Sequence, residues 1–191
     1  VAGGAFAAVV VGAVASDVCR AIVERCEGAQ GFERPGKNAS MLEYRQSWRC
    51  MLDDEELAAR LFAAVKAVVP PAFEGRRVVG LNERLRVLKY GVGDHFTPHT
   101  DAVFQRTPGK GGAPERVGEQ SYVTFILYLT EGFRGGETRF FGPGGKFFDV
   151  VPGVGDVLLF QHELWHSGEP LVEGYKYAVR SDVMYEPPHE A

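Results

Sequence analysis

The stretch "GDVLLFQHELWHSGEP", residues 155–170, decides the fold because it supports two interpretations that exclude each other. Its centre, "HELWH", matches the H-E-x-x-H signature of zinc peptidases, in which one face of a helix presents His162 and His166 to the metal and Glu163 acts as general base. The flanking residues argue against that helix, since "DVLLF" is a strand pattern and "SGEP" follows the second histidine at once. We therefore predict a strand that ends near this motif, with a zinc metallohydrolase as the alternative that a helix would support.

Length and composition limit what the chain can be. Its 191 residues are enough for one domain with a sizeable core and too few for two ordinary ones, so we expect a single domain over 1–191. Hydrophobic residues make up 45% and charged residues 24%, as in globular proteins. The formal net charge of −4 provides no basic field for nucleic acid, and no apolar stretch is long enough to span a bilayer. We therefore expect neither as a partner, and the oligomeric state is left open.

The cysteines and the N-terminal residues give indications of the cellular compartment. Cys19, Cys26 and Cys50 cannot all pair and form no C-x-x-C, which favours a reducing compartment such as the cytoplasm. The opening "VAGGAFAAVVVGAVAS", residues 1–16, is apolar but has no cationic segment. We expect a strand here, with the remnant of a targeting sequence as the alternative.

Helical patterns are confined to the first third of the chain. The segment 16–28, "SDVCRAIVERCEG", opens with Ser16 or Asp17 as N-cap and carries apolar residues at helical spacing. The segment 52–71, "LDDEELAARLFAAVKAVVPP", begins with an acidic turn and ends at Pro70. We expect these helices to form a support over about 16–70.

From about residue 76 the pattern changes to short β-branched and aromatic runs separated by glycine and proline. We expect strands in "NERLRVLKY", "SYVTFILYLT", "ETRFF", "KFFDVVP", "GDVLLFQ" and "YKYAVRSDVMY". These runs predict a sandwich or barrel over about 76–186, so the fold class is mainly β with N-terminal helices. The patternless stretch 102–120 is expected to be a flap over a bound substrate, with a disordered segment as the alternative.

A second metal motif precedes "HELWH". In "HTD", His99 and Asp101 are two residues apart, so both side chains point to one face of an extended segment. A His-x-Asp pair with a distant histidine is the facial triad of non-haem Fe(II) oxygenases. Alone, His-x-Asp is also compatible with an ordinary polar turn.

The residues around both histidines carry a family resemblance. The segment 90–101, "YGVGDHFTPHTD", fits Tyr-x-x-Gly-x-x-aromatic-x-x-His-x-Asp. The segment 166–176, "HSGEPLVEGYK", fits His-x-x-x-Pro-hydrophobic-x-x-x-Gly-x-Lys less one residue. The ordered combination, from about Leu85 to Tyr185, resembles the prolyl 4-hydroxylase-like catalytic domain of Fe(II)/2-oxoglutarate dioxygenases. That resemblance implies a double-stranded β-helix, or jelly-roll, core.

The resemblance also implies the site. Its Fe(II) ligands would be His99, Asp101 and His166, which leaves His162 and Glu163 as bystanders. Iron, 2-oxoglutarate and O₂ would supply the oxidant, with ascorbate as reductant and with succinate and CO₂ as products.

The far carboxylate of 2-oxoglutarate needs a cation, and Lys176 matches that position of the family. Arg180 lies on the same face of the expected strand and is the reserve candidate. The hydroxyls of Tyr90 and Thr124 match positions that would bond the same carboxylate.

The substrate is less clear from the sequence. A prolyl residue in an extended peptide is the first candidate, with another amino-acid side chain or a small molecule as the alternative. Tyr177 and "SDVMY" stand where prolyl 4-hydroxylases commonly have tryptophan. In the flap, Arg106, Lys110 and Arg116 could contact an acidic substrate. A binding module that keeps the barrel without catalysis is a further alternative.

Overall fold

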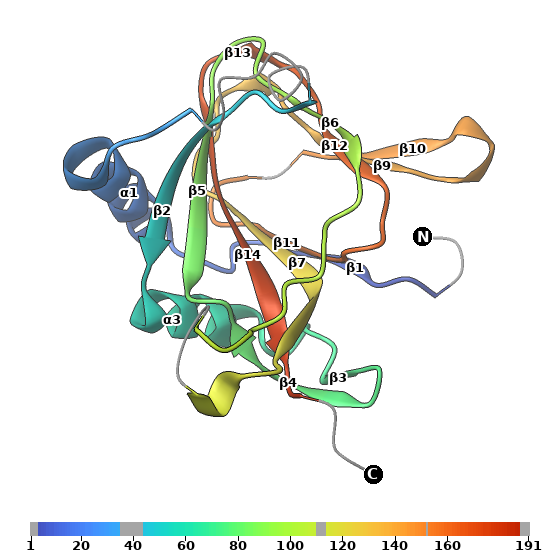
Figure 1. Cartoon of the computed structure of the whole chain (residues 1–191). Coiled ribbons are helices and arrows are strands. Elements are labelled where there is room, and N and C mark those ends of the chain that lie inside the picture. Colours follow the sequence, from blue (N-terminus) through green and yellow to red (C-terminus); the bar gives the residue numbers. More distant parts are fainter. Residues whose placement is uncertain (1–3, 35–43, 110–113, 152, 188–191) are drawn as a thin grey trace.

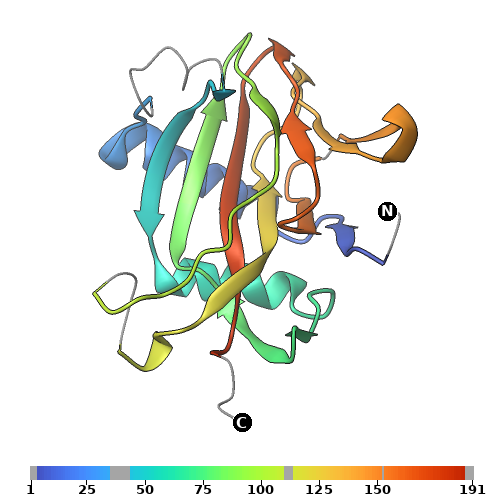
Figure 2. The same cartoon turned by 45° about the vertical axis from the view of Figure 1, so that its right-hand side comes forward.

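The computed structural model describes residues 4–34, 44–109, 114–151 and 153–187. A large curled antiparallel sheet faces a smaller sheet, and two helices cover the outer face of the large sheet (Figures 1 and 2). This is the predicted jelly-roll core with its helical support. No helix within the described ranges has the length and apolar character needed to cross a membrane.

The strands form two main layers. The large sheet runs β1 (Ala7–Val10), β11 (Val157–Gln161), β7 (Gln120–Tyr128), β14 (Lys176–Tyr185), β4 (Arg76–Leu81) and β3 (Ala72–Phe73), with β5 (Arg84–Tyr90) also pairing with β14 and β2 (Trp48–Asp53) pairing with β5. The small sheet runs β10 (Phe147–Val150), β9 (Thr138–Phe141), β12 (His166–Gly168) and β6 (Phe96–His99), and β13 (Leu171–Glu173) pairs with β8 (Arg134–Gly135).

The two helices differ in detail from their predicted ends. Helix α1 (Ser16–Arg25) has Ala15 as N-cap without a side-chain hydrogen bond, so the predicted serine or aspartate cap is wrong. Helix α3 (Glu55–Val65) is capped by Asp54, whose carboxylate accepts from the Leu57 N–H at 2.9 Å, and it ends before the predicted Pro70. Strand β2 was not predicted, because "WRCMLD" has no clean alternation.

Side chains of β7 and β14 alternate between two environments. Val123, Phe125 and Leu127 of β7 are fully buried in the core beneath α1 and α3, together with Val179 and Val183 of β14. The residues between them point the other way, into the space between the two sheets. Because successive residues of a strand face opposite sides, one strand here serves both the core and the site.

The deciding stretch 155–170 contains no helix. Strand β11 ends at Gln161, a turn closed by the Leu164 N–H to the Gln161 carbonyl (3.1 Å) follows, and β12 starts at His166. The histidines of "HELWH" therefore do not share a helical face, and the zinc-peptidase interpretation is wrong.

In the described part of the segment 102–120, Ala102, Val103 and Phe104 line the cavity between the sheets. The backbone of this segment is tied to β7 through the Ser121 N–H to the Phe104 carbonyl (2.9 Å). Arg106 is 1% exposed and forms ion pairs with Glu83 (2.5 Å) and Glu119 (2.8 Å), so it does not reach a substrate. Arg116 also pairs with these two carboxylates, and Lys110 lies outside the described residues.

The start of β11 is joined to the N-terminal segment at Gly155. Its carbonyl accepts from the Val14 N–H at 3.0 Å, and its φ of +83° is a left-handed conformation. A Cβ at Gly155 would lie 2.1 Å from the Val14 carbonyl oxygen. Only glycine fits this contact, which holds the segment leading into α1 against the sheet.

We expect Gly155→Ala to lower the free energy of unfolding by about 3 kcal/mol or more, because it adds a backbone clash to left-handed strain. Gly144→Ala is the matched control, since Gly144 has a φ of +71° and open space around its Cα. That variant should lose only about 1 kcal/mol. Denaturant unfolding measures both, and equal losses would contradict the importance of the Val14 contact.

Candidate active site

Three candidate ligands meet between the two sheets. His99 ends β6, His166 begins β12, and the two residues are direct partners across this antiparallel pair. Asp101 follows two residues after His99, where its N–H donates to the His162 carbonyl at 2.9 Å. One ligand atom from each of the three side chains lies within 4.8 Å of the others.

Both imidazoles are oriented by the backbone. The Nδ1 atoms of His99 and His166 lie 2.8 Å from the carbonyls of Thr97 and Leu164, respectively. Each Nε2 therefore carries the free lone pair, 3.9 Å and 3.8 Å from the Asp101 carboxylate. Two imidazoles and one carboxylate on one side of a cavity are a donor set that suits Fe(II).

The protonation states also suit a metal. Burial, helped by the neighbouring His166, lowers the pKa of His99 to about 4. Burial likewise lowers the pKa of His166. For Asp101, burial acts in the opposite direction, but the charges of Arg180 and His166 outweigh it and lower the pKa to about 2. At neutral pH the site therefore offers two neutral imidazoles and one carboxylate.

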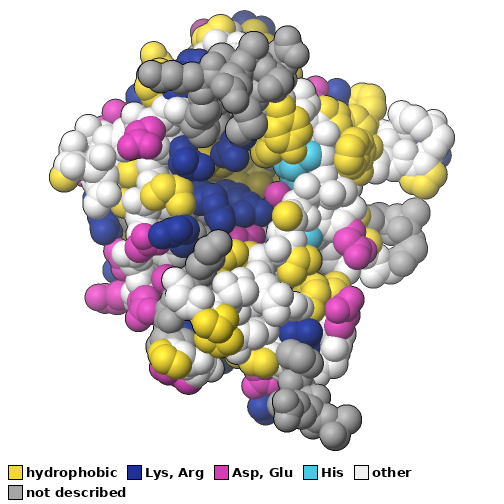
Figure 3. Space-filling view, viewed as in Figure 1, with side chains coloured by type: hydrophobic (Ala, Val, Ile, Leu, Met, Phe, Trp, Pro, Cys, Tyr) yellow, Lys and Arg dark blue, Asp and Glu magenta, His cyan; other side chains and the backbone are white. Residues whose placement is uncertain are grey.

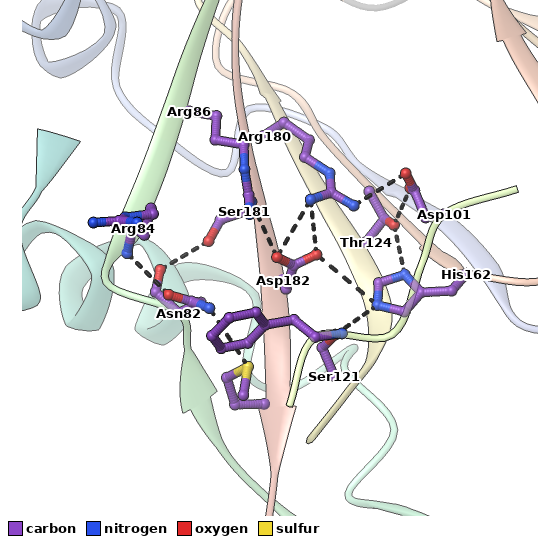
Figure 4. A network of polar contacts seen from close by, with 12 residues as sticks. Asn82, Arg84, Arg86, Asp101, Ser121, Thr124, His162, Arg180, Ser181 and Asp182 are labelled. Carbon is purple, nitrogen blue, oxygen red and sulfur yellow. Dashed lines mark hydrogen bonds and ion pairs between the residues drawn. The ribbon is translucent and has the colours of Figure 1, made fainter. Parts of the chain in front are cut away.

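Asp101 belongs to a directed hydrogen-bond network (Figure 4). The Thr124 hydroxyl donates to Asp101 at 2.5 Å and lies 2.8 Å from Nδ1 of His162. On the other side of that ring, Nε2 lies 2.9 Å from the Ser121 hydroxyl, which accepts from the Phe104 N–H. A neutral His162 with its proton on Nδ1 fits these contacts, because Nδ1 then donates to Thr124 and Nε2 accepts from Ser121. His162 thus lies outside the group of three candidate ligands, but it contacts Asp101 through Thr124 and is no bystander.

The ligands open into a cavity of about 420 Å³. Its residues include Tyr90, Lys176 and Arg180, which the sequence predicted, and Arg45 and Arg86, which it did not. The space-filling view shows a hollow with basic side chains on its floor and histidine at its edge (Figure 3).

Lys176 is the buried cation of this cavity. It is 5% exposed, its ammonium donates to the Gly136 carbonyl, and the rings of Tyr90 and Tyr128 lie 5.5 Å and 5.3 Å from Nζ. Among the described residues, no carboxylate forms an ion pair with it. Burial lowers the pKa of Lys176 to about 8, because the charged form has little to replace its water.

The strand register corrects the prediction for Thr124. Thr124 lies opposite Asp182, which is six positions along β14 from Lys176, a distance of about 20 Å. Thr124 therefore cannot share one carboxylate with Lys176. Hydroxyls that the sequence analysis missed lie closer, since Tyr128 neighbours Lys176 and its hydroxyl is 2.8 Å from that of Thr138. No motif marked these two residues.

Arg180 is engaged by carboxylates. Its Nη2 lies 3.0 Å from Asp101 and its Nη1 lies 3.1 Å from Asp182. Of the two predicted cations, Lys176 is therefore the one without a carboxylate partner.

The chain matches the 2OG-Fe(II) oxygenase superfamily over residues 85–181, more than half of its length, and it belongs to that family. It is accordingly a 2-oxoglutarate-dependent dioxygenase. The matched segment contains the three candidate ligands and Lys176.

Solved structures share the fold at low sequence identity. A Pseudomonas putida prolyl-4-hydroxylase is 17% identical, with 97% of this chain and 94% of that chain covered and a TM-score of 0.67. A Trichoplax adhaerens prolyl hydroxylase, in complex with a hypoxia inducible factor peptide fragment, is 16% identical (96% and 84% covered, TM-score 0.64). HygX from Streptomyces hygroscopicus, with nickel and 2-oxoglutarate bound, is 17% identical (97% and 84% covered, TM-score 0.60). No curated protein sequence matches the chain significantly.

The ligand assignment predicts distinct effects for the two histidines of "HELWH". We expect His166→Ala, like His99→Ala, to abolish tight binding of Ni(II) or Mn(II), because a ligand is lost. His162→Ala keeps all three ligands and should weaken binding by about 10- to 100-fold through the loss of orientation. Calorimetric titration of the metal measures this order. Full loss in His162→Ala with binding intact in His99→Ala would contradict the assignment.

Proposed function

We propose that this protein is an Fe(II)- and 2-oxoglutarate-dependent hydroxylase that acts on a prolyl residue in a peptide and releases succinate and CO₂. The observation that carries the proposal is the combination, in one cavity, of a two-histidine, one-carboxylate ligand set with a buried ammonium that forms no ion pair with a described carboxylate.

Each of these residues has a definite task in the proposal. His99, Asp101 and His166 would hold the iron, which together with 2-oxoglutarate and O₂ supplies the oxidant. Lys176 would bind the far carboxylate of 2-oxoglutarate, with the hydroxyls of Tyr90 and Tyr128 near it. The walls of the cavity between the two sheets would shield the reacting groups from water and orient the substrate.

Two observations support a peptide substrate. Two of the similar structures are prolyl hydroxylases, and one of them holds a peptide fragment. The cavity also opens to the surface beside Tyr44 and Val103, which are 43% and 52% exposed and could flank an extended chain. A small molecule or another side chain is the second candidate, favoured by the arginines of the cavity, which a prolyl ring does not need.

Turnover tests the substrate class. The purified protein, loaded with Fe(II) and supplied with ascorbate, 2-oxoglutarate and O₂, is incubated with a panel of proline-containing peptides. We expect succinate formation together with a gain of one oxygen atom in a peptide, detected by mass spectrometry. Stimulation by a small metabolite but by no peptide would reject the peptidyl-proline substrate and leave the oxygenase assignment intact.

Removing the Lys176 charge tests the cosubstrate site. We expect Lys176→Met to raise the Kd of 2-oxoglutarate for the Ni(II)-loaded protein at least about tenfold, since one partner of a buried charged contact is lost. Calorimetry or a competition assay measures the Kd. An unchanged Kd would transfer the role to Arg180.

The low pKa of Lys176 predicts a pH dependence of the same binding. Below about pH 8 the ammonium is charged and the affinity for 2-oxoglutarate should be constant. Above about pH 8 the free protein loses this proton, so the affinity should fall by up to about tenfold per pH unit. Lys176→Met should show no such fall, and a fall of the same size in both proteins would contradict the assignment.

A further inference from the structure

Two arginines lie side by side at one end of the cavity. Arg86 of β5 and Arg180 of β14 are direct partners across the antiparallel pair, and both line the cavity. Like charges at opposing positions of a sheet destabilise it. Arg180 is four residues, about 13 Å, from Lys176 along β14, so the cavity has two separate cationic ends.

A single carboxylate lies between these arginines. Asp182 is 3.1 Å from Nη1 of Arg86 and 3.1 Å from Nη1 of Arg180 (Figure 4). Burial lowers the pKa of Arg86, and the charges of Arg180 and Arg45 lower it further against the attraction of Asp182. Asp182 offers one negative charge to two guanidinium groups, and the other carboxylate beside Arg180 is Asp101, a candidate metal ligand.

A third arginine, Arg45, lines the same cavity from the segment that leads into β2. Nε of Arg45 donates to the Ser47 hydroxyl at 3.1 Å, and the guanidinium lies 4.9 Å from the centre of the Phe96 ring, which stacks on His99. Within the described part of the chain, no carboxylate forms an ion pair with Arg45. The remaining N–H donors of its guanidinium are therefore available to bind an anion beside the candidate metal ligands.

The expected ligands leave this charge in place. A divalent metal and a doubly charged 2-oxoglutarate cancel each other, Asp101 serves the metal, and Lys176 serves the far carboxylate. The three arginines then outnumber Asp182, the carboxylate that remains. An excess of buried positive charge in a cavity of about 420 Å³ is costly unless an anion pairs with it. Guanidinium forks match a carboxylate in geometry and charge.

We propose that Arg86, Arg180 and Arg45, which line one cavity, form a subsite for a carboxylate of the substrate. This inference rests on the proposed function for the reaction that follows binding. The carboxylate belongs either to the main chain of a small acid or peptide terminus, or to an acidic side chain next to the target residue. A cluster that merely holds β5 and β14 together would need one arginine for Asp182, whereas three arginines line the cavity.

Matched pairs of probes test the subsite by binding. Ni(II)-loaded protein saturated with 2-oxoglutarate is titrated with N-acetylproline and with N-acetylprolinamide, which lacks the carboxylate. A second pair, N-acetyl-aspartyl-prolinamide and N-acetyl-asparaginyl-prolinamide, presents a side-chain carboxylate instead. We expect the acid of one pair to bind at least about tenfold more tightly than its amide, and the pair that discriminates identifies the source of the carboxylate.

Variants assign the effect to the arginines. We expect Arg86→Met to reduce the preference for the acid about tenfold. Arg45→Met is a second test that does not depend on the folding of Arg86→Met, because it leaves the ion pairs of Asp182 intact. It should also reduce the preference. Arg84→Met is the matched control, because Arg84 lies on the same strand but outside the cavity, paired with Asp53. That variant should retain the full preference.

Two results would overturn the subsite: acids and amides that bind equally in both pairs, or a preference that persists in Arg86→Met and Arg45→Met. Titration of 2-oxoglutarate alone, done first, separates this failure from that of the proposed function. If 2-oxoglutarate binds through Lys176 and the acids show no preference, only the subsite is wrong.

Discussion

The antiparallel pairing of β14 with β5 and β7 is the constraint on which the rest of the structure depends. It places a row of apolar side chains, Val87, Val179 and Leu127, against the helices. One residue further along, Arg86 and Arg180 face the cavity. A slip of one residue would exchange these two rows, placing charges in the core and valines in the site. The hydrophobic core therefore also fixes the register of the site.

The candidate metal ligands are held before any metal binds. The imidazoles of His99 and His166 are set by backbone carbonyls, and Asp101 is held by its own N–H, by Thr124 and by Arg180. Such restraint reduces the conformational entropy that binding would cost and fixes which nitrogen faces the metal. The hydroxyls of Thr124 and Ser121 likewise hold the ring of His162, which lies outside the group of candidate ligands.

The cavity separates two kinds of cation. Lys176 is a compact charge among aromatic rings with a backbone carbonyl as its polar partner, whereas Arg86 and Arg180 are planar forks tied to Asp182. An ammonium in such surroundings titrates readily, but a guanidinium stays charged at any physiological pH. The two positions on β14 thus present different kinds of cation to the cavity.

The strand-rich core, the two helices and the His-x-Asp…His spacing could be predicted from the sequence, because they depend on local periodicity and on residues close together in the chain. The sequence also argued against a helix through 155–170 from the glycines and proline that flank "HELWH". Only the tertiary structure decided the pairings between distant strands. Register alone separated Thr124 from Lys176, joined His162 to Asp101, and placed Arg86 opposite Arg180. Contacts of this kind arise from the closure of the sheets, which no local pattern in the chain records.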